Sequence, residues 1–186
     1  IEINPGFAEA YFNRANIKAD LKRNEEALKD YNEAIKLKPD YASAFINRGV
    51  IEVEMQLYED ALNDYSRAIE LKPDDAIAYY NKGIVKKKQA LLQEAMMYFD
   101  KALFLKPDYA DAYVYRGIVK DELEQYEDAL KDYDKAIEDY NTAIKLDPND
   151  DNPYYNRSLA YEIIKETEKS VSDIKKYNEL ILKKCK

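Results

Sequence analysis

Proline recurs along this chain at a constant interval of 34 residues, at Pro5, Pro39, Pro73 and Pro107. The residues around three of these prolines also match one another: "AIKLKPDYASAFINRG", "AIELKPDDAIAYYNKG" and "ALFLKPDYADAYVYRG". A fixed period of this length indicates one supersecondary unit used repeatedly. Because a single unit of this size cannot bury both of its faces, we expect the units to stack and fold together as a solenoid.

Apolar and small residues recur within each period at helical spacing. The first half of each period carries an aromatic column followed four residues later by a small one, which is Ala15, Gly49, Gly83, Gly117 and Ser158. The second half carries alanines on either side of a ring, which is Tyr31, Tyr65, Phe99 or Tyr133. Spacings of three, four and seven place these columns on one face of a helix. Each unit is therefore predicted to be two amphipathic helices, and the proline stops the second one.

These columns resemble the tetratricopeptide repeat family across essentially all 186 residues. The resemblance implies an all-α fold, a right-handed superhelical solenoid of antiparallel helix pairs. Five repeats are expected, at residues 8–41, 42–75, 76–109, 110–150 and 151–186, the last with a C-terminal cap, and residues 1–7 resemble the tail of a preceding repeat. The sequence departs from the family at the turn between the two helices, where glycine is usual. Here the turn positions hold Lys22, Gln56, Ala90, Glu124 and Lys165.

The fourth repeat contains a duplicated heptad, in the stretch "DYDKAIEDYNTAIKLDP" from Asp132 to Pro148. Seven residues are close to two helical turns, so the insertion can lengthen the second helix of this repeat by seven residues while its apolar stripe stays nearly aligned. The favoured interpretation is a tolerated duplication. The alternative is that the extension protrudes and offers an apolar ledge around Tyr140 to a partner.

The resemblance implies a concave groove lined by the first helix of each repeat. An asparagine side chain has both a donor and an acceptor, so a row of them can pair with the backbone of an extended peptide; packing against the neighbouring repeat is the equally weighted alternative. Apolar residues beside this row are expected to form a wall for partner side chains. The candidate peptide-binding residues are Asn13, Asn47, Asn81, Asn156, Phe12, Asn16, Ile46, Tyr80, Val114, Tyr115 and Tyr155.

Cationic residues accompany the small column, at Arg14, Arg48, Lys82, Arg116 and Arg157. We expect them to extend along the surface and pair with acidic neighbours. A second basic group, Lys86 to Lys88, is expected to pair with acids of the adjoining repeats or with an acidic ligand. The carboxylate clamp that some members use for chaperone tails needs cations at groove positions that here hold Phe12, Ile77 and Asn81, so we expect no binding of such tails.

Composition excludes several classes of function. A net charge of −8 and a pI near 4.8 argue against binding nucleic acid, and no apolar run is long enough for a membrane span. The chain has no histidine, no metal-ligand spacing and no phosphate-binding loop, so no cofactor, metal or catalytic residue is predicted. The single cysteine, Cys185, fits a reducing compartment, with the cytoplasm favoured.

Two functional hypotheses follow from these patterns. The first is a scaffold for protein–protein interaction that binds an extended peptide or partner segment in its concave groove. The second is a regulatory or substrate-recruiting repeat segment of a larger enzyme or assembly. An apolar face on the helix from Ala8 to Leu21 also predicts end-to-end self-association of this segment.

Overall fold

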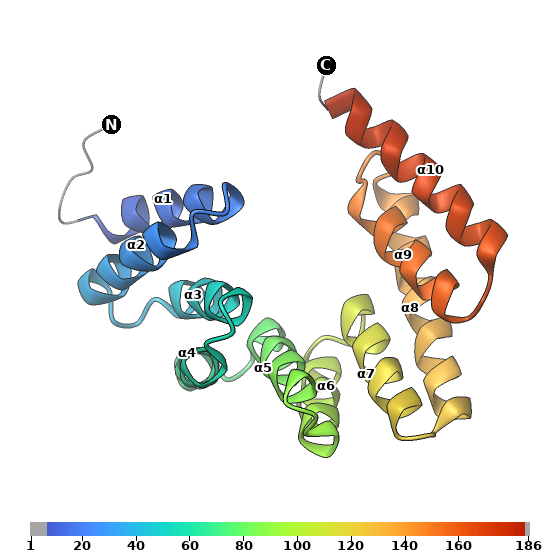
Figure 1. Cartoon of the computed structure of the whole chain (residues 1–186), viewed down its shortest axis with the longest axis horizontal. Helices are drawn as coiled ribbons and strands as arrows, with labels where there is room; N and C mark the ends of the chain where they lie inside the picture. Colours follow the sequence, from blue (N-terminus) through green and yellow to red (C-terminus); the bar gives the residue numbers. More distant parts are fainter. Residues whose placement is uncertain (1–6, 185–186) are drawn as a thin grey trace. The chain divides into compact units, whose positions relative to one another are not determined.

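The computed structural model describes residues 7–184, which form ten helices and no strands (Figure 1). The predictions made above for residues 1–6 and for Cys185 concern residues outside this range. Two compact units divide the chain, the first ending at Leu105 and the second beginning at Lys106. The first unit contains α1 (Ala8–Asp20), α2 (Asn24–Leu37), α3 (Ala42–Glu54), α4 (Tyr58–Leu71), α5 (Ala76–Lys88) and α6 (Leu92–Leu105). The second contains α7 (Ala110–Glu122), α8 (Tyr126–Leu146), α9 (Asn152–Ile163) and α10 (Thr167–Lys184).

The turn inside each helix pair has the same backbone geometry. At the end of α1, the N–H of Lys22 donates to the carbonyl of Ala19 at 2.8 Å, and the N–H of Arg23 donates to that of Lys18 at 2.9 Å. These two bonds are the Schellman pattern, which places the residue after the helix in the left-handed region. The same region holds all five turn residues in which the sequence lacks glycine, at Lys22 (φ 58°), Gln56 (62°), Ala90 (58°), Glu124 (60°) and Lys165 (63°).

The glycines in the first helix of a pair make room for the ring of the second helix. A Cβ added at Gly49 would lie 2.7 Å from Cε1 of Tyr65, and one added at Gly83 would lie 2.7 Å from Cε1 of Phe99. Both rings are fully buried. The close approach of the two helices therefore depends on the missing side chain, which explains why the small column and the ring column occur together in the sequence.

A charged pair joins the two helices of most pairs. The Arg14 guanidinium donates through Nε and Nη2 to both oxygens of Asp30, each at 2.6 Å. Burial alone would raise the pKa of Asp30, but the hydrogen bonds from Arg14 and Lys18 and their positive charges outweigh it, so the pKa is lowered. Residues sixteen positions apart form the same two-pronged contact in Arg48–Asp64, Arg116–Asp132 and Arg157–Asp173. The expected pairing of the cationic column with acidic neighbours is confirmed at these positions.

The third helix pair replaces both members of this contact. Lys82 stands where the other pairs have arginine, and Tyr98 stands where they have aspartate. The Lys82 ammonium lies 5.0 Å from the centroid of the Tyr98 ring and donates to Oγ of Ser66 at 2.8 Å. A cation over an aromatic face here takes the place of the ion pair.

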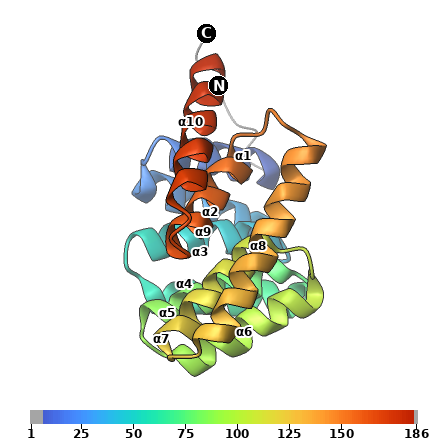
Figure 2. The ribbon, with the colours of Figure 1, turned by 90° about the vertical axis from the view of Figure 1, so that its right-hand side faces the viewer.

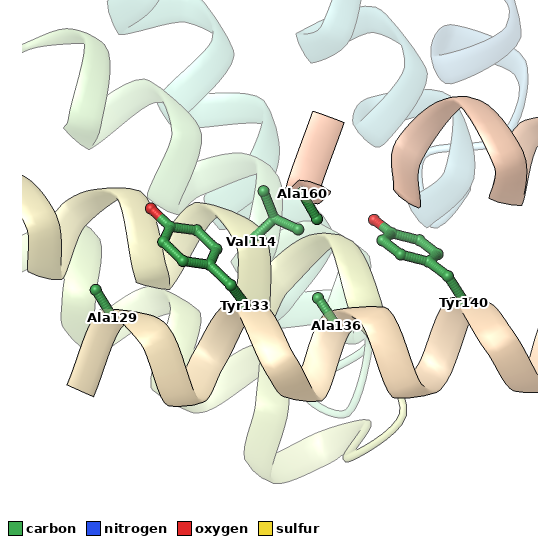
Figure 3. Packing of buried hydrophobic residues seen from close by; sticks show 6 residues of the cluster. All are labelled: Val114, Ala129, Tyr133, Ala136, Tyr140 and Ala160. Carbon is green, nitrogen blue, oxygen red and sulfur yellow. The ribbon is translucent and has the colours of Figure 1, made fainter. Parts of the chain in front are cut away.

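Helix α8 is 21 residues long, whereas α2, α4 and α6 have 14 residues each. The added heptad is part of the core, since Tyr140 is only 6% exposed and packs in one cluster with Tyr133, Val114 and Ala160. Figure 3 shows both tyrosine rings on the same side of α8, with Ala160 of α9 facing the stretch between them. The hypothesis of an apolar ledge around Tyr140 is wrong, because α7 and α9 cover that ring.

The two copies of the heptad differ in the helices that they contact. Asp132, in the first copy, accepts hydrogen bonds from Arg116 of α7. Asn141, in the second copy, accepts one from Arg157 of α9, just as Asn32 of α2 accepts one from Arg48 of α3 at 2.6 Å. In α2 a single heptad serves both neighbours. In α8 the contact with α9 through Asn141 uses the second copy, and α7 is contacted by Asp132 of the first copy and by Tyr140 of the second. Helix α9 is therefore docked one heptad further along α8 than it would be without the insertion.

Helix α10 closes the second unit and lies alongside α9 in both views (Figures 1 and 2). Its Tyr177 ring packs against Tyr155 of α9, with centroids 5.2 Å apart. Near its end, Lys184 forms an ion pair with Asp151, a carboxylate that is otherwise buried at the start of α9. These contacts fix the second half of α10 on the preceding helix.

Candidate functional site

The asparagine column of the first unit differs in exposure along its length. Asn13 is exposed, whereas Asn47 and Asn81 are half-buried. Only Asn47 among these three forms a side-chain hydrogen bond in the described residues, and its Nδ2 donates to Oδ1 of Asn16 at 2.9 Å. The asparagine column is thus partly engaged within the protein, and Asn47 is the member of these three that an internal hydrogen bond holds in place.

Asn16 is the centre of a small hydrogen-bonded group. Its Oδ1 accepts a second bond, from the hydroxyl of Tyr31 at 2.7 Å, and burial raises the pKa of that hydroxyl to about 12. Tyr31 is therefore protonated at neutral pH and acts as a donor. A depression of about 270 Å³ opens here, which we call the first-unit pocket, and it is lined by Asn16, Ala19, Asp20, Tyr31, Asn47, Val50 and Ile51.

The two donors fix the orientation of both amides in the first-unit pocket. Because Oδ1 of Asn16 accepts from Tyr31 and from Asn47, the Nδ2 of Asn16 is left as a donor and the Oδ1 of Asn47 as an acceptor. Neither atom bonds to any residue in the described part of the chain. The two amides that line the pocket therefore offer both donor and acceptor capacity in a fixed orientation.

The second unit contains a matching group with a different central residue. Oδ1 of Asp111 accepts from the hydroxyl of Tyr140 and from Nδ2 of Asn156, the latter at 3.2 Å. A depression of about 230 Å³ adjoins it, which we call the second-unit pocket. Its lining is Lys106, Asp108, Tyr109, Ala110, Asp111, Asp139, Tyr140, Ala143, Asp150, Asn152, Pro153 and Asn156.

The predicted apolar wall requires a correction. Ile46 and Val114 are only 7% and 8% exposed, because Ile46 packs with Ala68 and Ala78 while Val114 packs against Tyr133. They belong to the core and are not available to a partner. The helical stripe buried in this fold is wider than the columns used to predict it, since each helix packs against neighbours on two sides.

The aromatic members of the wall remain at least partly accessible. Phe12, Tyr80 and Tyr115 are half-buried, and Tyr155 is exposed. Phe12 packs at a tilt against Tyr41, with ring centroids 4.9 Å apart, so its position is fixed from one side. Aromatic surface therefore remains beside the first-unit pocket at Phe12.

Sequence reasoning did not find three residues of these sites. The sequence indicates Tyr31 only as a ring of the buried stripe, and Tyr140 as such a ring or as part of an apolar ledge, although each uses its hydroxyl in a pocket. No sequence pattern indicates Asp111, because the position that corresponds to Asn16 in the fourth repeat is Ile118, seven residues later. Within the lysine group, Lys86 pairs with Glu94 of its own helix pair at 2.9 Å.

Models of known protein families match most of this sequence. A model described as "TPR repeat" matches residues 15–56, 51–89 and 129–162, and one described as "Tetratricopeptide repeat" matches residues 76–109. The chain belongs to the tetratricopeptide repeat family. The fold class predicted from the sequence, an all-α helical repeat solenoid, is confirmed, and such a chain is a protein-interaction scaffold.

Solved structures agree with this assignment. A crystal structure of MamA is 25% identical with a TM-score of 0.60, covering 92% of this chain and 96% of that one. The TPR domain of Arabidopsis OM64 is 25% identical with a TM-score of 0.62, covering 64% and 99%. YrrB, whose title describes "a TPR protein with an unusual peptide-binding site", is 22% identical with a TM-score of 0.58, covering 95% and 88%. None of the curated proteins matches the chain significantly.

Two further findings concern the described residues 7–184. No three or more carboxylate, histidine or cysteine side chains in this range are grouped so that they could hold a metal ion. No helix in the same range combines the length and the apolarity that crossing a membrane requires.

Proposed function

We propose that this tetratricopeptide repeat chain binds an extended peptide segment of a partner protein, and that the first-unit pocket pairs with the peptide backbone. The observation that carries the proposal is the fixed pair of amides at Asn16 and Asn47. Their remaining donor and acceptor match the C=O and N–H groups that an extended peptide presents. Phe12, beside the pocket, supplies apolar surface for an adjoining side chain.

Fixed orientation favours binding for a physical reason. An amide held by two internal hydrogen bonds loses little conformational freedom when a ligand binds, so more of the interaction energy appears as affinity. Tyr31 contributes through its position, because its ring is buried and its hydroxyl points to Asn16. Recognition of the backbone also makes the site tolerant of the peptide's sequence, as expected of a scaffold.

A chaperone-tail clamp does not fit the first unit. The positions that need a cation hold Phe12, Ile77 and Asn81, none of which is cationic. The nearest guanidinium groups, those of Arg14 and Arg48, are already occupied by Asp30 and Asp64. Two free carboxylates at the end of a peptide would therefore find no unneutralised cation in this group. We propose an internal peptide segment as the ligand.

The proposal is tested with peptides selected from a random phage-displayed library on the wild-type chain. Asn47→Ala removes one acceptor and the bond to Asn16, and we expect it to weaken a selected peptide by about five- to tenfold. Asn63→Ala is the matched control, because Asn63 is an exposed asparagine of α4 that lines neither pocket. If Asn47→Ala and Asn63→Ala bind the peptide as the wild type does, the pocket is not the binding site.

A second interaction is favoured by the exposure of Ile17. Its counterparts one and two periods later, Ile51 and Val85, are 4% and 0% exposed under the preceding helix, whereas Ile17 is 60% exposed. We propose that this face of α1 supports end-to-end association of the segment. Sedimentation velocity at rising concentration should show association of the wild type that Ile17→Lys abolishes, and equal behaviour of the two proteins would refute it.

A further inference from the structure

We propose that the second-unit pocket accepts a cationic side chain, lysine or arginine, from a peptide partner. The inference rests on the proposed function, because it names a residue class of the ligand that the scaffold would bind. It is carried by the change of one central residue between two pockets that share the same design.

The hydrogen-bonded groups of the two pockets share a tyrosine and an asparagine and differ in their central residue. Tyr140 and Asn156 take the places of Tyr31 and Asn47, and both bond to a single oxygen in each case. The oxygen belongs to Asn16 in the first unit and to Asp111 in the second. Because α9 is docked on the second copy of the heptad, the group has moved two turns back along α7, from the position of Ile118 to that of Asp111. The insertion thus brings a carboxylate into a place that an amide occupies elsewhere.

This exchange removes donors from the centre of the group and adds an acceptor. In the first unit, both N–H groups of Asn16 Nδ2 remain as donors. In the second unit, Asp111 has no N–H, and one of the two N–H groups of Asn156 is used on the carboxylate. The second oxygen of Asp111 and Oδ1 of Asn156 are left as acceptors, beside the one remaining N–H of Asn156. A peptide C=O therefore finds fewer donors here than in the first unit, whereas an ammonium or guanidinium finds two acceptors.

The surrounding charges favour the same kind of ligand. Three further carboxylates line the second-unit pocket, those of Asp108, Asp139 and Asp150, against one ammonium, that of Lys106. Lys106 lies over the ring of Tyr109, 4.9 Å from its centroid. One oxygen of Asp139 is paired with Lys135 at 3.1 Å, but its Oδ2 is buried without a hydrogen-bond partner in the described part of the chain. A donor entering the pocket would satisfy an oxygen that is otherwise costly to bury.

Tyr140 is a permanent hydrogen-bond donor to Asp111. Burial, and next the nearby Asp111 charge, raise the pKa of the Tyr140 hydroxyl far above the ordinary value. The phenol therefore stays protonated and donates to Asp111. Tyr140, Asn156 and the backbone of α7 together hold Asp111 in place before any ligand arrives. A charge fixed in this way binds an opposite charge with little loss of conformational entropy.

The test uses the full chain and a phage-displayed library of random peptides, with wild type, Asp111→Asn and Asn16→Asp as targets. Asp111→Asn keeps an oxygen for Tyr140 and Asn156 while adding a donor. We expect wild type to enrich peptides with lysine or arginine at one fixed position, and Asp111→Asn to enrich peptides without that preference. Asn16→Asp, the reciprocal change, should add a second basic position. Circular dichroism checks that the helical content of each variant is unchanged.

A peptide selected on the wild type then shows how much the positive charge contributes to affinity. Replacing its arginine by neutral citrulline should weaken binding to the wild type by about fivefold, and should leave binding to Asp111→Asn nearly unchanged. Asp134→Asn is the matched charge control, since Asp134 is exposed on α8 and outside the pocket; the citrulline effect should persist in it.

The outcomes separate the two proposals. Peptides selected without a basic preference, or the same preference in wild type and Asp111→Asn, would overturn the cation site and leave peptide binding intact. Failure of every target to select any peptide would overturn the proposed function, and the cation site with it.

Discussion

Glu52 should make the first unit less stable as the pH rises. Its counterparts in the first and fourth repeats are Lys18 and Lys120, which form ion pairs with Asp30 at 2.7 Å and Asp132 at 2.9 Å. Glu52 instead places a carboxylate near Asp64, in a buried position where its Oε2 has no hydrogen-bond partner in the described residues. Burial first, and then the Asp64 charge, raise its pKa from 4.5 to about 7.

The size of the pH effect on stability follows from the raised pKa of Glu52. In the unfolded chain Glu52 ionises near its ordinary pKa of 4.5, whereas in the folded chain it ionises near 7. The protonated side chain is therefore favoured by folding, and this contribution is fully present below about pH 4.5 and lost as the pH rises through 7. A shift of this size corresponds to at most about 3 kcal/mol between the two limits. Arg48, 3.7 Å from Oε1 of Glu52, already supplies part of the compensation.

The perturbation is Glu52→Gln, measured by urea denaturation followed by circular dichroism from pH 5 to pH 8. At pH 8 we expect the variant to unfold with a free energy about 1–3 kcal/mol higher than the wild type, because it removes a buried charge that repels Asp64. At pH 5, where Glu52 is protonated, the two proteins should differ by less than about 1 kcal/mol. Glu54→Gln, a change at an exposed glutamate two residues away on the same helix, is the control. A difference between wild type and Glu52→Gln that stays constant from pH 5 to pH 8 would refute the reasoning.

Two further predictions concern the turn residues and the long helix. Ala90→Gly should raise the free energy of unfolding by about 1 kcal/mol in urea denaturation, since Ala90 has a φ of 58° that glycine adopts without strain; an unchanged or lower stability would contradict this. Tyr140→Phe should lower the free energy of unfolding by about 1–2 kcal/mol because it removes the bond to Asp111. The same denaturation assay measures it, and equal stability of the two proteins would show that this bond contributes nothing.

The fold class could be predicted from the sequence because its strongest determinants are local and periodic. Proline spacing marks the helix ends, and the pairing of Gly49 with Tyr65 recurs as Gly83 with Phe99. The partners of the arginine column were also within reach of the sequence, since Arg14–Asp30 and Arg48–Asp64 repeat one separation of sixteen residues. That signal joins two different helices and is not visible in a search for columns on a single one.

The candidate sites were less predictable, for reasons that depend on tertiary structure. Nothing in the order of residues distinguishes whether α9 docks on the first or second copy of the heptad, because both copies present the same stripe. The choice decides whether Ile118 or Asp111 meets Asn156. Similarly, Ile46 was placed on the groove from its position beside Asn47, although packing against Ala68 and Ala78 on neighbouring helices buries it.

The duplicated heptad of α8 also has a consequence for how such arrays evolve. The first copy binds the helix before it through Asp132, and the second copy binds the helix after it through Asn141 and the helix before it through Tyr140, so the added residues are packed on both sides. A gain of seven residues is therefore close to neutral for stability, whereas a gain of three or five would rotate Tyr140 away from its partners. The same step changes which residue of α7 lies in a pocket, from an aliphatic side chain to a carboxylate. Slippage by one heptad during replication can thus alter ligand preference in a repeat protein without any substitution at the binding surface.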